Sequence, residues 1–191
     1  MIDIEKDTSK AGAYILYNGY FLFMFGFNED KTNLGVVRFG GKREIRETVI
    51  ECVRREIKEE SSLDIEFYQT DFTYLEDNGK IKLNEKCNPI FVRKGVDGKL
   101  SIMYLTYGKG VLKPRMETQG ILLLRRTDID NICTKNLTFK EYIETGGKYI
   151  LSDILLPENY HLIPLVQLQF LNELFDFEPA LMRDYIKTPE N

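Results

Sequence analysis

The sequence contains a single histidine, and this scarcity limits the kinds of catalysis it can support. His161 is expected to open an apolar helix far along the chain from the acidic segment described below, which favours a packing or surface role. The three cysteines, Cys52, Cys87 and Cys133, are widely spaced and form no CxxC pattern, so we expect reduced thiols. Nucleophilic schemes that pair serine or cysteine with histidine therefore have little support.

The sequence also lacks an excess of positive charge and any long apolar run. The 30 Asp and Glu residues outnumber the 26 Lys and Arg residues, so we expect no basic surface for general nucleic-acid binding. No run is long enough to cross a membrane, and the acidic start at residues 1–7 has no signal-peptide core. These features predict a cytoplasmic protein that acts away from membranes.

Length and composition favour one globular domain over residues 1–191. The 43% hydrophobic and 29% charged fractions are those of a globular protein, and a chain of this length can bury a sizeable core. No internal repeat, low-complexity segment or linker divides the sequence. The oligomeric state is left open, and a homodimer is compatible with these features.

An acidic helix is the most informative feature that is present. Thr48 and Glu51 form a capping-box pattern at its start. Apolar residues then recur at helical spacing, namely Val49, Cys52, Val53 and Ile57. Glu56, Glu59 and Glu60 fall on one face, because helix positions three and four apart are neighbours. Clustered carboxylates repel one another unless a cation lies among them, and hard cations such as Mg²⁺ prefer oxygen ligands. The segment therefore predicts a metal-holding helix.

The segment from Gly41 to Leu63 resembles the Nudix box. That motif runs Gly, five residues, Glu, seven residues, Arg-Glu, an aliphatic, any residue, Glu-Glu, any residue, Gly and an aliphatic. The matching residues here are Gly41, Glu47, Arg55, Glu56, Ile57, Glu59, Glu60 and Leu63. Ser62 departs from the motif, because the family has glycine at this position. A left-handed serine at the helix end would cost about 1 kcal/mol. So many fixed positions are far more specific than a lone glycine-rich loop.

The resemblance implies an α+β fold, the Nudix α/β/α sandwich, with a mixed β-sheet and the box helix on one face. Local patterns predict a hairpin of residues 13–17 and 20–27 around Asn18-Gly19, and a strand over 34–39 that Gly40-Gly41 end. Further strands are expected at 63–76, 90–93, 100–107 and 120–124, and a turn at 77–80. Short helices are expected at 127–132 and 138–144. A helical C-terminal extension is expected over about 157–191, patterned from Leu162 to Phe175, with a last helix at 178–186.

The resemblance also implies roles for individual residues. A Mg²⁺ or Mn²⁺ ion would be held by the carbonyl of Gly40 and by Glu56, Glu59 and Glu60. The catalytic set would comprise Glu56, Glu60, Glu47, Arg55 and Glu117, with one carboxylate taking the proton of the attacking water. Each residue also has a plain alternative as a solvated surface charge, and for Glu117, in the loop before strand 120–124, the two readings stay open.

The implied function is metal-dependent hydrolysis of the pyrophosphate bond in a small molecule, a nucleoside diphosphate linked to another moiety. The alternative is a nucleotide-sensing module of the same fold with little or no turnover. The intact set of three box glutamates argues against that alternative, because a pure sensor need not keep a metal site. The substrate itself is not predicted, because specificity would come from loops and C-terminal helices that carry no transferable motif.

Overall fold

The computed structural model describes residues 2–76, 79–83 and 85–187. The helices are α1 (Ile4–Asp7), α2 (Val49–Ser61), α3 (Arg126–Thr134), α4 (Phe139–Glu144), α5 (Val166–Phe177) and α6 (Pro179–Lys187). The strands are β1 (Thr8–Tyr17), β2 (Tyr20–Phe27), β3 (Leu34–Val37), β4 (Phe39–Lys42), β5 (Asp64–Phe67), β6 (Thr73–Leu75), β7 (Gly79–Ile81), β8 (Phe91–Lys94), β9 (Leu100–Lys109), β10 (Gly120–Leu124), β11 (Lys148–Leu151) and β12 (Leu162–Pro164). None of the helices in these ranges is long and apolar enough to cross a membrane.

The twelve strands of the described ranges form one mixed sheet. Its main order is β11-β10-β2-β1-β9-β8-β6-β7, and β3, β4, β5 and β12 pair off this path. At the centre, β1 and β9 run parallel with Tyr14 opposite Leu105, whereas β1 and β2 run antiparallel. Strand β1 therefore has parallel and antiparallel partners, and it also pairs with β4, which carries Gly40 and Gly41.

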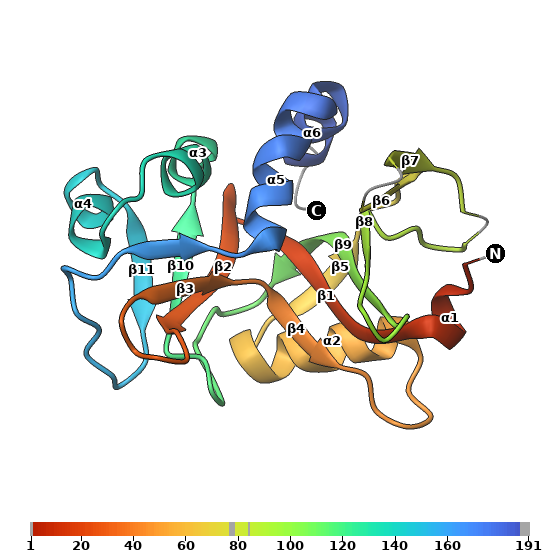
Figure 1. Ribbon diagram of the computed structural model, residues 1–191, viewed down its shortest axis with the longest axis horizontal. Helices are drawn as coiled ribbons and strands as arrows, with labels where there is room; N and C mark the ends of the chain where they lie inside the picture. The colour runs from red at the N-terminus through yellow and green to blue at the C-terminus, as the bar shows by residue number, and fades with distance from the viewer. Residues whose placement is uncertain (1, 77–78, 84, 188–191) are drawn as a thin grey trace.

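Apolar side chains fill both faces of the sheet. One cluster joins α2 to the sheet, with Val53 and Ile57 fully buried against residues such as Ala13 and Tyr104. The other joins the same sheet to α3, α4, α5 and α6. Figure 1 shows α2 below the strands and α3, α5 and α6 above them. This arrangement confirms the expected α+β class, a mixed sheet between helical layers.

The predicted hairpin is confirmed at the start of the sheet. Strands β1 and β2 pair with Tyr17 opposite Tyr20, which leaves only Asn18 and Gly19 in the turn. Their φ angles are 48° and 79°, the left-handed conformations that a two-residue type I′ turn requires. Asn and Gly are the residues that adopt these conformations at the lowest cost.

The strand expected over residues 34–39 is divided at Arg38. Strand β3 pairs with β2, whereas β4 pairs with β1, so the chain steps from one hairpin strand to the other between them. Arg38 turns inward at this step and is only 7% exposed. Its Nη1 donates to the carbonyls of Ala11 and Phe39, at 3.3 and 3.1 Å, which satisfies backbone groups at the break.

The single strand expected over residues 63–76 is wrong. The chain forms β5, which pairs with β9, and β6, which pairs with β7 and β8. Side chains hold the loop between them, since the Asn88 amide donates to the carbonyl of Thr70 at 2.7 Å. The Thr70 hydroxyl donates in turn to the carbonyl of Phe72 at 3.1 Å. Residues 77 and 78 of the expected turn lie outside the described residues.

The C-terminal extension is not wholly helical. Strand β12 runs parallel to β3 with Ile163 opposite Gly35, and α5 begins only at Val166. Pro164 explains the late start, because a proline disfavours helical geometry at the residue before it. His161 does not open a helix either. It forms a bridge to Thr138, and its Nδ1 lies 2.8 Å from the carbonyl oxygen of Asn136.

Candidate active site

Close packing requires both glycines that precede the box helix. Gly40 has φ 121°, and a Cβ there would lie 2.3 Å from the carbonyl oxygen of Ala11 on β1. A Cβ on Gly41 would lie 2.4 Å from the Glu56 carboxyl carbon. The first glycine lets β4 approach β1, and the second makes room for a box glutamate. The local geometry thus brings the strand end and the acidic helix together.

Helix α2 starts and packs as its sequence predicts. The Thr48 hydroxyl accepts from the backbone N–H of Glu51 at 3.2 Å, and the Glu51 carboxylate accepts from the Thr48 N–H at 2.8 Å. The apolar stripe is fully buried, including Cys52. Burial raises the pKa of the Cys52 thiol to about 12, so this cysteine stays protonated and is no nucleophile. The opposite face is left to the glutamates.

Arg55 links three acidic side chains of the box. Its Nε and Nη2 bind both oxygens of Glu47, at 2.8 and 3.0 Å, in the bidentate geometry that guanidinium groups favour. Its Nη1 donates to Glu56 at 2.9 Å and to Glu59 at 3.2 Å. The hydrogen bonds from Arg55 lower the pKa of Glu47, and the same partners raise the pKa of Arg55. Arg55 therefore positions Glu47 and Glu56 and offsets part of their mutual repulsion.

Glu60 stands apart from this network and is the most perturbed acid of the site. Its Oε2 accepts from the backbone N–H of Gly40 at 2.8 Å. Burial raises the pKa of Glu60 to about 7, and the nearby Glu56 and Glu59 carboxylates also raise it. The Gly40 N–H and the buried guanidinium of Arg38 act in the opposite direction. Such a carboxylate gains most from a neighbouring cation, because a cation would stabilise its charged form.

The box carboxylates are suitable ligands for a hard divalent cation, but in the described residues they do not converge on a common point. Within the described ranges, one oxygen of each box carboxylate makes no hydrogen bond: Glu56 Oε2, Glu59 Oε1 and Glu60 Oε1. Oxygen donors of this kind are what Mg²⁺ and Mn²⁺ prefer. The same ranges contain no group of three Asp, Glu, His or Cys side chains already placed to hold a metal. Metal binding by Glu56, Glu59, Glu60 and the Gly40 carbonyl thus stays a prediction.

A cavity of about 540 Å³ opens beside Glu60. Its wall is largely apolar, from Met24, Phe25, Phe27, Val37 and Leu165. Its polar lining includes Glu60, Glu117 and Gln119. The structure therefore places Glu117, which is exposed, on the same cavity as Glu60. A catalytic role for Glu117 remains a prediction.

Two residues of this region were not predicted from the sequence. Arg38 supplies a buried positive charge next to Glu60, and its only sequence signal is a charged residue inside an apolar strand, two positions before Gly40. Gln119 lines the cavity and accepts from the backbone N–H of Phe27 at 2.9 Å. Its amide nitrogen makes no hydrogen bond to the residues that the structure describes, so it can donate to a ligand in the cavity.

Ser62, the departure from the box, takes the left-handed conformation. Its φ is 67° and its ψ is 0°, and its N–H donates to the Lys58 carbonyl at 3.1 Å as the C-cap of α2. The Ser62 side chain makes no hydrogen bond to the described residues, so nothing there offsets the strain. Serine therefore keeps the geometry that suits glycine and bears the cost of a Cβ.

We expect Ser62→Gly to leave the free energy of unfolding unchanged or to raise it by up to about 1 kcal/mol. Relief of left-handed strain stabilises the folded state, whereas the added freedom of glycine stabilises the unfolded state. Urea unfolding measures the difference. The matched control is Ser61→Gly, which should destabilise, because the buried Ser61 hydroxyl donates to the Ile57 carbonyl at 2.6 Å. A clear loss of stability in the Ser62 variant would contradict the strain argument.

Comparison with known proteins gives similarities in structure only. No family model and no curated protein sequence matches this chain. A hydrolase of the Nudix family from Clostridium perfringens is 19% identical, with a TM-score of 0.49, over 65% of this chain and 85% of that one. A Nudix hydrolase from Nitrosomonas europaea is 12% identical, with a TM-score of 0.46, over 83% and 79%. An Ap4A hydrolase from C. elegans is 14% identical, with a TM-score of 0.46, over 72% and 89%.

Proposed function

We propose that this chain is a metal-dependent Nudix hydrolase that cleaves the pyrophosphate bond of a nucleoside diphosphate linked to another moiety. The observation that carries the proposal is the position of Glu60. Its half-buried carboxylate, with a pKa raised to about 7, lies beside Glu56 and opens onto the cavity. A perturbed carboxylate in a cleft is typical of a catalytic or ligand-binding group.

In this proposal, the residues of the site have different roles according to their positions. Arg55 holds Glu47 and Glu56 in place through its hydrogen bonds. Glu56, Glu59 and Glu60 would hold the ion with the Gly40 carbonyl, and a bound Mg²⁺ or Mn²⁺ would offset the charge of the diphosphate and polarise it. One carboxylate, from Glu56, Glu60 or Glu117, takes the proton of the attacking water. The water oxygen then bonds to one phosphorus, and the bridging oxygen leaves with the other phosphate.

The apolar cavity is the site that we assign to the nucleoside. Phe27 is half-buried on its wall and offers a ring on which a base can stack. The amide nitrogen of Gln119, which no described residue engages, can donate to a base or ribose oxygen. A volume of about 540 Å³ is in the range of cavities that hold a small-molecule ligand. With Glu60 at its edge, the nucleoside would lie next to the candidate reacting bond.

The alternative is a nucleotide-sensing module. The observation that favours it is the ion pairing of Glu56 and Glu59 with Arg55, because carboxylates held in this way are not gathered about a cation.

Four further features stay predictions from the sequence: single-domain organisation, the cytoplasmic location, the homodimer and the lack of nucleic-acid binding.

A substrate screen separates the two functions. The protein is incubated with Mg²⁺ or Mn²⁺ and nucleotide sugars, ADP-ribose, dinucleoside polyphosphates or oxidised nucleotides, and the released phosphate-containing products are measured. Binding of each compound is measured in parallel by calorimetry. Turnover of at least one compound supports the hydrolase, whereas tight binding without turnover supports the sensor.

We expect Glu117→Gln to lower kcat by at least tenfold, if Glu117 takes the proton of the attacking water, because an amide cannot act as a base. The variant is assayed at saturating metal with a substrate from the screen. The matched control is Glu29→Gln, which removes an exposed carboxylate from the rim of the same cavity. An unchanged kcat would leave the chemistry to the box glutamates.

A further inference from the structure

A second cavity adjoins the first and differs from it in charge. This cavity, the basic groove, has a volume of about 700 Å³. Five cationic residues line it: Lys10, Arg38, Arg93, Lys94 and Lys99. Among the described residues that line it, Asp97 is the only acidic one. Because the whole chain carries a net charge of −4, this local excess of positive charge runs against the composition.

Three of these cations have no acidic partner among the described residues. Lys10, Lys94 and Lys99 are exposed and form no ion pair with the residues that the structure describes. Arg93 does have one, since its Nε lies 3.0 Å from a Glu76 oxygen. The Asp97 carboxylate accepts from the backbone N–H of Lys99 at 3.0 Å. The positive charge of the groove is therefore largely uncompensated.

Two further observations point to an anionic ligand. Lys10 on β1 lies directly opposite Lys42 on β4, a pairing of like charges that is unfavourable in a sheet. Arg38, at 7% exposure, uses only Nη1 for hydrogen bonds to described residues. Its Nε and Nη2 make no hydrogen bond to the described residues and are not among the fully buried unpaired atoms, so their donors can reach a ligand in the groove. A phosphate would satisfy these donors and offset the lysine charges.

The groove adjoins the candidate active site. Val37 and Leu165 line both the groove and the apolar cavity. Gly40 lines the groove, and its N–H donates to Glu60, which lines the cavity. The Glu60–Gly40 contact thus lies where the two spaces meet. A ligand cleaved at Glu60 would have one half in the apolar cavity and the other half in the groove.

Resting on the proposed function, we infer that the basic groove binds a phosphate carried by the part of the substrate beyond the scissile pyrophosphate. The preferred substrate is then a nucleoside diphosphate linked to a moiety that bears phosphate of its own, with a nucleoside on the apolar side. A substrate whose second moiety is neutral leaves the lysines without a partner and binds more weakly.

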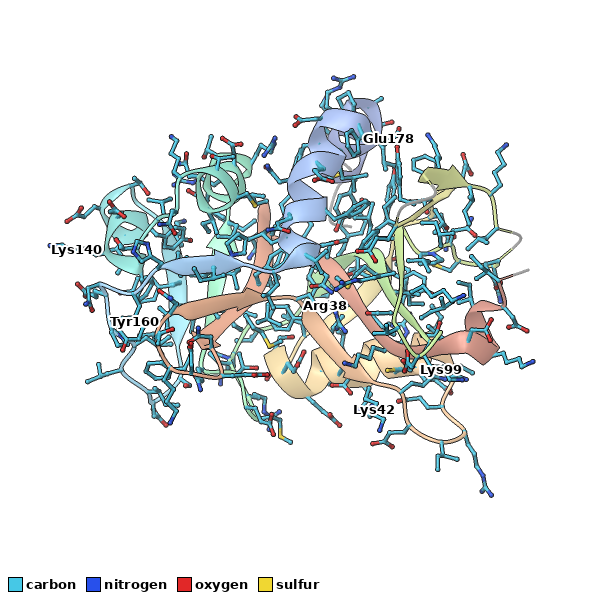
Figure 2. All side chains as sticks on the ribbon, viewed as in Figure 1. Arg38, Lys42, Lys99, Lys140, Tyr160 and Glu178 are labelled. Carbon is cyan, nitrogen blue, oxygen red and sulfur yellow. The ribbon has the colours of Figure 1, made fainter. Side chains whose placement is uncertain are left out.

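The test compares two variants of equal charge change. The groove variant carries Lys10→Gln, Lys94→Gln and Lys99→Gln. The control variant carries Lys135→Gln, Lys140→Gln and Lys187→Gln, all of them exposed residues outside the two cavities. Figure 2 shows Lys140 at the opposite end of the molecule from Lys99. Because both variants lose three positive charges, a difference between them reports the position of the charge and not its amount.

The substrates are a dinucleoside tetraphosphate and the dinucleoside diphosphate with the same nucleosides. For the groove variant, we expect KM for the tetraphosphate to rise at least tenfold, with kcat within twofold of wild type. KM for the diphosphate should change less than twofold, and the control variant should match wild type on both substrates. An equal change on both substrates, or no change on either, would overturn the inference.

A binding measurement keeps the inference separate from the hydrolase proposal. Inorganic tripolyphosphate is titrated by calorimetry into each protein in metal-free buffer. We expect wild type and control to bind it and the groove variant to bind it at least tenfold more weakly, with affinities that fall as salt is added. If the groove variant binds tripolyphosphate more weakly but no substrate is turned over, phosphate binding by the groove is supported and the hydrolase proposal fails. Equal binding by all three proteins would overturn the groove.

Discussion

Hydrolysis should stop when excess EDTA removes free Mg²⁺ and should return when Mg²⁺ is restored. The physical reason is the crowding of Glu56 and Glu60, which Arg55 and Arg38 offset only in part. A diphosphate brought to this site adds more negative charge, and a divalent cation is the group that can offset it. The measurement is product release over time with EDTA, with EDTA and excess Mg²⁺, and with Mg²⁺ alone. Full turnover in EDTA would contradict the metal site.

The Glu60 carboxylate should also make the free energy of unfolding of the metal-free protein depend on pH. In the metal-free protein, the pKa of Glu60 is raised from the ordinary 4.5 to about 7, so the folded state holds its proton more tightly than the unfolded state does. The resulting stabilisation is fully present below about pH 4.5 and is lost as the pH rises through 7. Its size is roughly 3 kcal/mol. Stability of the metal-free protein should therefore fall between these pH values.

Mg²⁺ should consequently raise the melting temperature more at pH 8 than at pH 5. At the lower pH a proton occupies Glu60 and competes with the metal, because a carboxylate must lose its proton to become a ligand. Thermal unfolding with and without Mg²⁺ at both pH values measures the difference. An equal effect of Mg²⁺ at the two pH values would show that Glu60 does not bind the ion.

Glu60→Gln should lower turnover by two to three orders of magnitude while the fold survives. A glutamine oxygen can still accept from the Gly40 N–H, so the contact between β4 and α2 is kept. The substitution removes the charge that would bind the cation or take the proton of water. For the same reason, the metal-free variant should be more stable than wild type at pH 8, since no buried charge has to form there.

Steady-state kinetics and urea unfolding at pH 5 and pH 8 test this variant together. The control is Glu158→Gln, an exposed carboxylate with no side-chain hydrogen bond to the described residues. The control should match wild type in both measurements. A Glu60 variant that turns over substrate at the wild-type rate would remove Glu60 from the site, whatever its stability.

The box could be read from the sequence because its chemistry is local. Thr48 and Glu51 cap a helix through contacts three residues apart, and helical spacing alone places Glu56 and Glu60 on one face. The Asn18-Gly19 turn is local in the same sense. These features need no knowledge of distant partners, and the structure has the capped helix and the turn where the sequence predicts them.

The parts that were missed depend on partners far along the chain. Residues 162–164 continue the apolar pattern of the expected helix. Pro164 disfavours a helix there, but only the pairing with β3, some 128 residues earlier, makes these residues a strand. Strand β11 needs β10 in the same way. The burial of Arg38 follows from the step of the chain between two neighbouring strands. No local pattern carries such information, and the same holds for the two cavities, which assemble from several segments.

Because β12 pairs with β3, the C-terminal segment contributes to the cavity walls, whereas the acidic residues of the site come from α2. Leu165 follows β12 directly and lines both cavities, whereas the box glutamates lie on α2, more than a hundred residues earlier. Selection acting on the C-terminal segment can thus reshape the walls around a ligand without touching the acids. The pairing also sets a limit on that freedom. An insertion or deletion that slips the register of β12 would leave the edge of β3 open to other chains, so change there should proceed by substitution.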